Sequence, residues 1–394
     1  MIYYLFSYKE NLPGVNAKVV DKIKALNELG TPVKGIVLYE NEKSDLSSFS
    51  DKYYDKYYIS PPRFHNLILE SRPFGIINSF LVKRRFVKHL YNKILKNKTI
   101  DLLITRYSIS DFNTLWFVKK LNGKILYESN TNEIEQLKLV YKGLLNSPLW
   151  VSYDYFSEKY LGPVVLRRVK GIICVTNEIA KFQSQRIGAK FNNLVEVVSN
   201  GIICSSIKRK KKVEVIESIN LIMIRGTDAP WHGYEIIRDA LLKTSFNCKL
   251  YIVGDITKDV EDERFVFTGK LTSNEIDQLI DRENIHIGIG SLALHLVGLN
   301  EACPLKVRQY LARGLPVLYN YFDTDLSINP EFSEKYCYYL DGDLDFNLLR
   351  KWYLELNKTK NFENNISEWA TKNLDYEIKM VKYRSIIEKN LERN

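Results

Sequence analysis

Short apolar runs alternate with segments of helical periodicity along most of the chain. The run at residues 2–6 predicts a buried strand, apolar residues then recur at helical spacing over 19–29, and residues 33–39 return to a strand. We expect Asn16 to cap the intervening helix and Gly30 to end it. This first stretch therefore predicts a β-α-β unit.

The same alternation continues through the rest of the sequence, with one interruption. Helices are predicted from about 234, from about 274 and over 304–313. Further short apolar runs predict strands at residues 101–105, 124–128, 171–175, 194–198, 220–224, 249–253, 285–289 and 316–319. The basic run at 208–212 breaks the pattern, and we expect a solvated linker or edge there because like charges cannot share a core. The order of elements favours an α/β architecture with parallel sheets.

The interruption divides the chain into two halves. We expect a Rossmann-like, doubly wound N-terminal domain over residues 1–203 and a second one over 204–370. A helical pattern from about 363 runs to the end of the sequence, and we expect its last part, about 371–394, to return to the first domain. Ligands of such sheets bind at the carboxyl ends of the strands, so two facing sheets would place a site in the cleft between them.

The segment from residue 301 to 317 carries the most specific chemistry. Pro304 suits the first turn of a short helix and Gly314 its end. The free N–H groups and positive dipole at the helix N-terminus predict a cradle for a diphosphate. Lys306 and Gln309 share one face of this helix and could reach a ligand there, and Glu301 lies in the loop before it.

These residues resemble the signature of retaining glycosyltransferases of the GT-B fold. Glu301, Gln309 and the Gly-Leu-Pro-Val sequence from Gly314 match its spacing. In family four of these enzymes both ends of the motif are Glu; the first contacts the donor sugar and the second the ribose hydroxyls. The resemblance implies these roles for Glu301 and Gln309, and a donor contact for Leu305. As a neutral amide, Gln309 accepts hydrogen bonds less strongly than a carboxylate.

A second match lies at the start of the second domain. The stretch from Gly226 to residue 233 has the spacing of the family's Gly-Arg…Lys-Gly loop, with Thr227 where Arg is usual and His232 where Lys is usual. Arg225, His232 and Lys306 are the local candidates to supply the phosphate-binding charge. The Trp-His-Gly-Tyr sequence here resembles a sub-group of bacterial surface-polysaccharide enzymes.

The first domain shares features of the same family. Gly14 and Val15 resemble its glycine loop, which lies near the donor phosphates. Glu128 and Asn130 stand where the family has a strand-end motif facing the cleft, and we expect them on the acceptor side together with Arg106.

The resemblance implies a transferase that moves a sugar from a nucleotide diphosphate sugar to an acceptor hydroxyl, with retention and without a metal or other cofactor. We expect Glu301, Lys306 and His232 to be the catalytic residues. Gln309 and Thr227 keep open the alternative of a degenerate partner protein that binds nucleotide sugar, acceptor or a sister enzyme without turnover. A nucleotide-sugar epimerase of similar shape fits the motifs less well.

Composition limits the other possibilities. The 394 residues carry a net charge of +10, which indicates an anionic partner, and no DNA- or RNA-binding motif is visible. Five scattered cysteines and five histidines argue against a disulfide framework and a zinc site. No apolar run is long enough to span a bilayer, and the first ten residues do not resemble a secretory signal, so we expect a cytoplasmic protein.

A basic segment at residues 83–98 has two interpretations. Phe86, Leu90 and Ile94 recur four residues apart among lysines and arginines, which predicts an amphipathic helix with basic flanks. The helix could simply dock its apolar stripe on its own sheet. Alternatively, it could hold the protein on the cytoplasmic face of an anionic membrane, where a lipid-linked glycan acceptor would be found.

Overall fold

The computed structural model describes residues 1–10, 13–59, 74–143, 147–210, 218–226, 228–245 and 247–393. The chain forms two compact units. Unit 1 comprises Met1–Val198 and Met380–Asn394, and unit 2 comprises Ser199–Lys379. The boundary at 198/199 lies five residues before the one expected from the sequence, and the return to unit 1 lies nine residues after the expected one.

Unit 1 is built on a seven-stranded sheet with the order β3-β2-β1-β4-β5-β6-β7. Its strands are β1 (Ile2–Ser7), β2 (Val33–Tyr39), β3 (Tyr54–Tyr58), β4 (Leu102–Arg106), β5 (Ile125–Ser129), β6 (Gly171–Cys174) and β7 (Val195–Val197). All neighbouring strands are parallel. The central strands are apolar because helices cover both faces of a sheet of this kind. The order reverses between β1 and β4, the position where doubly wound sheets bind ligands.

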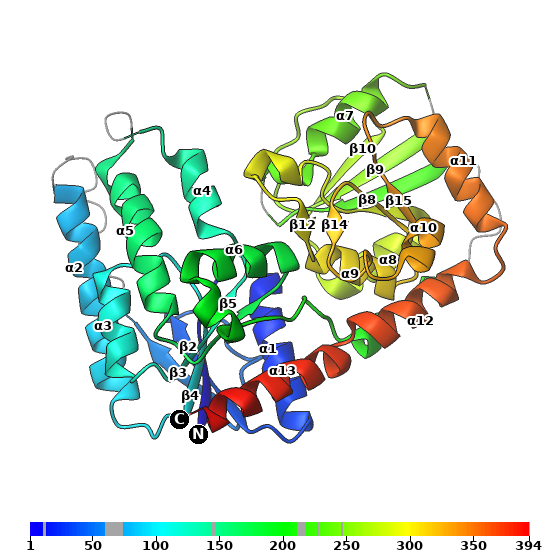
Figure 1. The fold of residues 1–394 in the computed structure, drawn as a ribbon. Coiled ribbons are helices and arrows are strands. Elements are labelled where there is room, and N and C mark those ends of the chain that lie inside the picture. The colour runs from blue at the N-terminus through cyan, green and yellow to red at the C-terminus, as the bar shows by residue number, and fades with distance from the viewer. Residues whose placement is uncertain are drawn as a thin grey trace. The chain divides into compact units, whose positions relative to one another are not determined.

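The helices of unit 1 are α1 (Pro13–Glu28), α2 (Phe74–His89), α3 (Phe112–Lys120), α4 (Glu133–Val140), α5 (Leu149–Leu166) and α6 (Asn177–Ile187). A π-helical turn (Leu90–Leu95) continues α2. The C-terminal helix α13 (Tyr376–Glu392) runs beside α1 (Figure 1). Side-chain caps begin several of these helices; Asp111, for example, accepts from the N–H of Thr114 in a capping box before α3.

Unit 2 repeats this topology in a six-stranded parallel sheet of order β10-β9-β8-β11-β13-β15. Its strands are β8 (Ile219–Ile224), β9 (Cys248–Val253), β10 (Phe265–Gly269), β11 (Ile285–Ile289), β13 (Val317–Tyr319) and β15 (Cys337–Tyr339), and β12 (Glu301–Ala302) pairs separately with β14 (Phe322–Asp323). Its helices are α7 (Tyr234–Leu242), α8 (Ser273–Arg282), α9 (Leu305–Ala312), α10 (Pro330–Tyr336), α11 (Phe346–Asn357) and α12 (Phe362–Leu374). The order reverses between β8 and β11.

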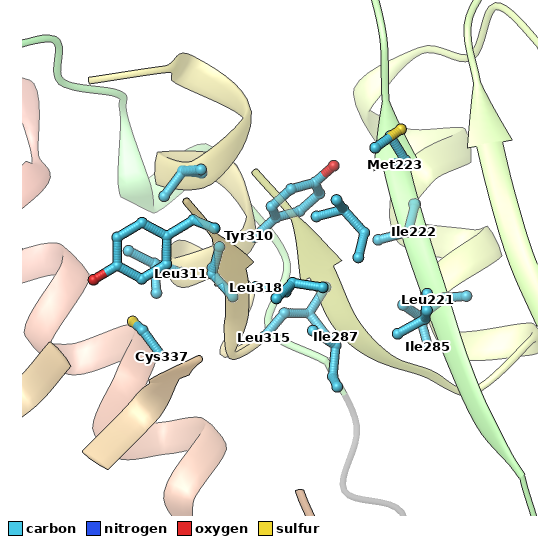
Figure 2. Close-up of a cluster of buried hydrophobic side chains, with 14 of the residues drawn as sticks. Leu221, Ile222, Met223, Ile285, Ile287, Tyr310, Leu311, Leu315, Leu318 and Cys337 are labelled. Carbon is cyan, nitrogen blue, oxygen red and sulfur yellow. The ribbon is translucent and has the colours of Figure 1, made fainter. Parts of the chain in front are cut away.

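The core of unit 2 lies between this sheet and its helices. Leu221 and Ile222 of β8, Ile287 of β11, and Tyr310 and Leu311 of α9 are completely buried in one cluster (Figure 2). Helix α9 is therefore packed directly on the two strands that flank the reversal of strand order.

The fold class expected from the sequence is confirmed, with three local corrections. Asn16 is not the cap of α1: the helix begins at Pro13, and the Asn16 amide bridges the backbone of Lys9 at 3.2 and 2.8 Å. The single C-terminal helix expected from about 363 is two helices, separated at Asp375, which has an extended backbone. Finally, five strands were not anticipated: β3, β10, β15 and the short pair β12 and β14.

Candidate functional site

Three nitrogen-bearing side chains meet at the carboxyl edge of the unit 2 sheet. Arg225 directly follows β8, His232 ends a short 3-10 helix (Pro230–His232), and Lys306 lies in the first turn of α9. The Lys306 Nζ donates to the carbonyl of Gly290, just after β11, at 2.9 Å and lies 3.4 Å from the His232 Nδ1. The cluster thus occupies the point where the strand order reverses.

The surrounding backbone holds these side chains in place. The N–H of Arg225 donates to the carbonyl of Val253 at 2.8 Å, so β9 fixes the end of β8. Gly233 has a left-handed backbone with φ of +71°, and a Cβ there would lie 2.6 Å from the Cβ of Leu292. The N–H of Leu292 also donates to the carbonyl of His232 at 3.2 Å. The His232 loop is therefore attached to the loop that follows β11.

The electrostatics of the cluster favour an anion. Burial, and then the charge of Arg225, lowers the pKa of Lys306 to about 7. Burial, followed by Lys306 and Arg225, lowers the pKa of His232 to about 3, so this imidazole is neutral at physiological pH. An anion at this position would offset both the burial and the like-charge repulsion that lower these pKa values.

Arg225 retains unused hydrogen-bonding capacity. Its side chain is 1% exposed, and its Nη2 forms an ion pair with Asp228, which is itself largely exposed. Its guanidinium lies 4.9 Å from the ring centre of Tyr234, but within the described part of the chain its Nε and Nη1 have no hydrogen-bond partner. Buried donors without acceptors are costly, and a phosphate oxygen is the kind of acceptor that would satisfy them.

The other donor-side residues lie on the same elements. Gln309 and Leu305 are half-buried on α9, and Gly226 is exposed after Arg225. Glu301 is half-buried and lies in β12, not in a loop, with Phe322 as its partner across the two-stranded sheet. Thr227 lies outside the described residues. Pro304 is the N-cap of α9 and Gly314, with φ of +81°, follows its end, close to the predicted limits.

Glu128 differs from the expectation that it faces a ligand. It is 2% exposed, forms an ion pair with Lys22 of α1, and accepts from the hydroxyls of Tyr4 at 2.5 Å and Tyr383 at 2.7 Å. Burial opposes its charge, but Lys22 leads the interactions that together lower its pKa to about 2. Glu128, in β5, is therefore bonded to side chains of α1, β1 and α13 in the interior of unit 1. These contacts stabilise the packing of the unit and leave the carboxylate turned away from solvent.

The remaining unit 1 candidates lie near the carboxyl edge of their sheet. Gly14 is exposed in the first turn of α1, Val15 is half-buried beside it, and Arg106 is exposed at the end of β4. The Asn130 Oδ1 accepts from the Lys18 Nζ at 3.0 Å. Sequence reasoning missed Lys18, although its spacing of four residues from Gly14 on one helix was a usable signal.

A second buried ionic network in unit 2 was also not anticipated. Arg308 is fully buried and forms ion pairs with Asp323 and with Asp325, the latter at 2.5 Å. Asp325 also accepts from the hydroxyl of Ser199 at 2.8 Å and from the Lys379 Nζ at 2.5 Å. Asp325 thus holds the first and the last residue of unit 2 to the helix that carries Lys306.

In the basic segment 83–98 the structure shows features of both interpretations. Leu90 and Ile94 are buried in unit 1, as expected of a helix docked on its own domain. Phe86 remains 38% exposed, and Lys83 is partnered by Asp154 at 3.3 Å. The apolar stripe is therefore only partly covered.

Two features are absent from the part of the chain that the structure describes. Within them, no three His, Cys, Asp or Glu side chains are grouped as a metal ion would require. Likewise, none of the helices described has the length and apolar character needed to cross a membrane.

Comparison with known proteins gives the fold. No protein family and no curated protein matches the sequence. Among solved structures, a glycosyltransferase from Rickettsia africae ESF-5 is similar over 100% of this chain and 99% of its own, with 15% identity and a TM-score of 0.63. A sucrose-phosphate synthase from Thermosynechococcus elongatus is similar over 98% of both chains, with 11% identity and a TM-score of 0.67. Anabaena HepE, in complex with UDP and glucose, is similar over 98% and 99%, with 12% identity and a TM-score of 0.62.

Proposed function

We propose that this chain, which has the GT-B fold, transfers a sugar from a nucleotide diphosphate sugar to an acceptor hydroxyl. The observation that carries the proposal is the cluster of Arg225, His232 and Lys306 at the reversal of strand order in unit 2. HepE, a protein of the same fold, binds UDP and glucose, which supports a nucleotide sugar as donor here.

The cluster would act on the diphosphate leaving group. Arg225 offers two buried donors, which suit the paired oxygens of a phosphate. Lys306 gains a proton as the anion approaches, and the N–H groups that begin α9 add partial positive charge. Groups held in this way stabilise negative charge as it develops when the bond to the sugar breaks.

We further propose that transfer retains the configuration of the sugar and needs no metal. The cluster supplies positive charge from side chains, as a divalent cation would do elsewhere. The retaining outcome, the contact of Glu301 with the sugar and the contact of Gln309 with the ribose are supported by the resemblance of the motif. The amide of Gln309 can still hydrogen-bond a hydroxyl.

Turnover of nucleotide sugars tests this proposal. A thermal-shift screen against UDP-, GDP-, ADP- and dTDP-sugars identifies the donor, because a ligand at 100 times its Kd stabilises by about 2.7 kcal/mol. Glu301→Ala and Lys306→Ala should then greatly reduce turnover, whereas Lys351→Ala, on the exposed face of α11, should not. Wild-type rates in both site variants would refute the site assignment. Donor binding without turnover in the wild-type protein would favour the degenerate partner.

For the acceptor, we propose a glycan or lipid-linked glycan used in bacterial surface polysaccharide synthesis. The side chains of Arg85, Lys88 and Lys93 are exposed on the same segment as the partly exposed Phe86, and such a basic segment suits the surface of an anionic membrane. Each basic residue near such a surface contributes about 1 kcal/mol. Replacing these three by Ser should abolish co-sedimentation with anionic vesicles at low salt, and unchanged co-sedimentation would exclude this surface.

A further inference from the structure

The side chain of Tyr310 connects the two elements that carry Arg225 and Lys306. Tyr310 is fully buried on α9, one helical turn after Lys306. Its hydroxyl accepts a hydrogen bond of 2.8 Å from the N–H of Ile224, the last residue of β8. Ile224 immediately precedes Arg225. Figure 2 shows the ring between α9 and the strand that carries Ile222 and Met223.

This hydrogen bond takes the place of a missing contact in the sheet. The register of β11 with β8 ends at Gly288 and Ile222, so β11 does not pair with the last two residues of β8. The Tyr310 ring passes over Gly288, where a Cβ would lie 2.4 Å from the ring. Because Gly288 has no side chain, the hydroxyl can reach the backbone of Ile224. On the other side of β8, the N–H of Arg225 donates a hydrogen bond of 2.8 Å to the carbonyl of Val253 in β9.

We propose that Tyr310 is a positioning residue for the anion site, setting the separation between Arg225 and Lys306 through the N–H of Ile224. The inference rests on the proposed donor site. Because Tyr310 is fully buried, it acts through the backbone: its hydroxyl fixes the end of β8 from one side, and β9 fixes it from the other. An aromatic ring suits this role because it has only two side-chain torsions and is held by close packing.

Two further properties of the structure support this role. Arg225 contributes to the lowered pKa of Lys306, so the two side chains already interact in the absence of a ligand. Burial raises the pKa of the Tyr310 hydroxyl, so it stays protonated and neutral over the working pH range. The hydrogen bond to Ile224 is therefore not switched by pH.

Tyr310→Phe tests the proposal, with Tyr353→Phe as the matched control. Tyr353 is a buried tyrosine of α11 whose ring packs on Phe362. In Tyr310→Phe the N–H of Ile224 loses its acceptor, and hydrogen exchange of the 219–226 segment should become faster. Donor affinity should fall roughly tenfold, because Arg225 would no longer be held in position for its charge-assisted hydrogen bond to the phosphate. The pH at which affinity begins to fall should also move upward, because a larger separation from Arg225 raises the pKa of Lys306.

The outcomes separate this inference from the proposed function. A change in the pH midpoint is specific, because a loss of general stability would not move it. If Tyr310→Phe matches Tyr353→Phe in donor affinity, pH midpoint and exchange, Tyr310 has no positioning role. If the wild-type protein binds no nucleotide sugar, the proposed function fails. In that case, hydrogen exchange of residues 219–226 in Tyr310→Phe still tests the role of Tyr310. Exchange as slow as in the wild type also overturns this role, and faster exchange supports the conclusion that Tyr310 fixes the end of β8.

Discussion

The lowered pKa of Lys306 predicts that donor affinity decreases as the pH rises above neutrality. In the free protein burial and Arg225 hold this pKa at about 7, so about half of the Lys306 side chains are charged at pH 7. A bound diphosphate would place opposite charge beside Lys306 and should restore the ordinary lysine pKa of about 10.4. Binding therefore takes up a proton wherever the free side chain is neutral and the bound one charged.

The size of the effect follows from these two pKa values. Between pH 7 and pH 9 the charged fraction of free Lys306 falls from about one half to about one in a hundred, so affinity should fall about 50-fold, or about 2.3 kcal/mol. At pH 8 binding should take up about 0.9 proton per donor. His232 adds no pH dependence in this range, because its pKa of about 3 leaves it neutral throughout.

Isothermal titration calorimetry in buffers of different ionisation enthalpy measures this proton uptake directly. A nucleotide sugar such as UDP-glucose is the suitable probe, since it lacks the second phosphate ionisation near pH 6 that a phosphate monoester has. Lys306→Met should bind weakly and without proton uptake, whereas Lys351→Met should behave as the wild type. Flat affinity from pH 7 to 9 in the wild-type protein, with uptake below about 0.2 proton at pH 8, would refute the reasoning.

The buried ionic networks predict further effects on stability. Glu128→Gln, which leaves Lys22 buried without its carboxylate, should destabilise unit 1 by about 3 kcal/mol, as measured by hydrogen exchange of β5 in denaturant. Because the pKa of Glu128 is lower in the folded state, its contribution to the free energy of unfolding is fully present above about pH 4.5 and is lost as the pH falls through about 2. A difference between Glu128→Gln and the wild type that disappears at higher pH instead would contradict this. Asp325→Asn removes one of the two carboxylates that pair with Arg308 and should lower the free energy of unfolding of unit 2 by about 2 kcal/mol, measured by urea unfolding. The control Glu355→Gln, in an exposed ion pair, should lower it by less than about 0.5 kcal/mol. Equal effects of these two substitutions would show that the Asp325 network is not a special anchor.

The parts of the fold that the sequence predicted well are the buried central strands. A parallel strand covered on both faces must be apolar along its length, so residues 33–39 and 285–289 could be located to the residue. The edge strand β3 reads Tyr-Asp-Lys-Tyr-Tyr and was missed, because an edge strand tolerates polar residues that hide it from such a pattern. Asn16 was misassigned for a related reason: its side chain satisfies the backbone of Lys9, and sequence alone does not show which backbone groups need a partner.

The same limit applies to charged residues, and it separates structural sites from ligand sites. Arg308 and Glu128 are as deeply buried as Arg225, yet each is surrounded by groups of opposite charge or by hydroxyls that satisfy it. Lys306, among the residues that the structure describes, has only a carbonyl and an imidazole as hydrogen-bond partners. A buried charge without a buried counter-charge is unstable unless something else supplies one. The sequence does not show which of these charged residues has a buried partner. The three-dimensional distribution of opposite charge does: Lys306 has no carboxylate partner among the described residues, and Arg225 has only the exposed Asp228, so this cluster is the place in unit 2 that best suits an anion.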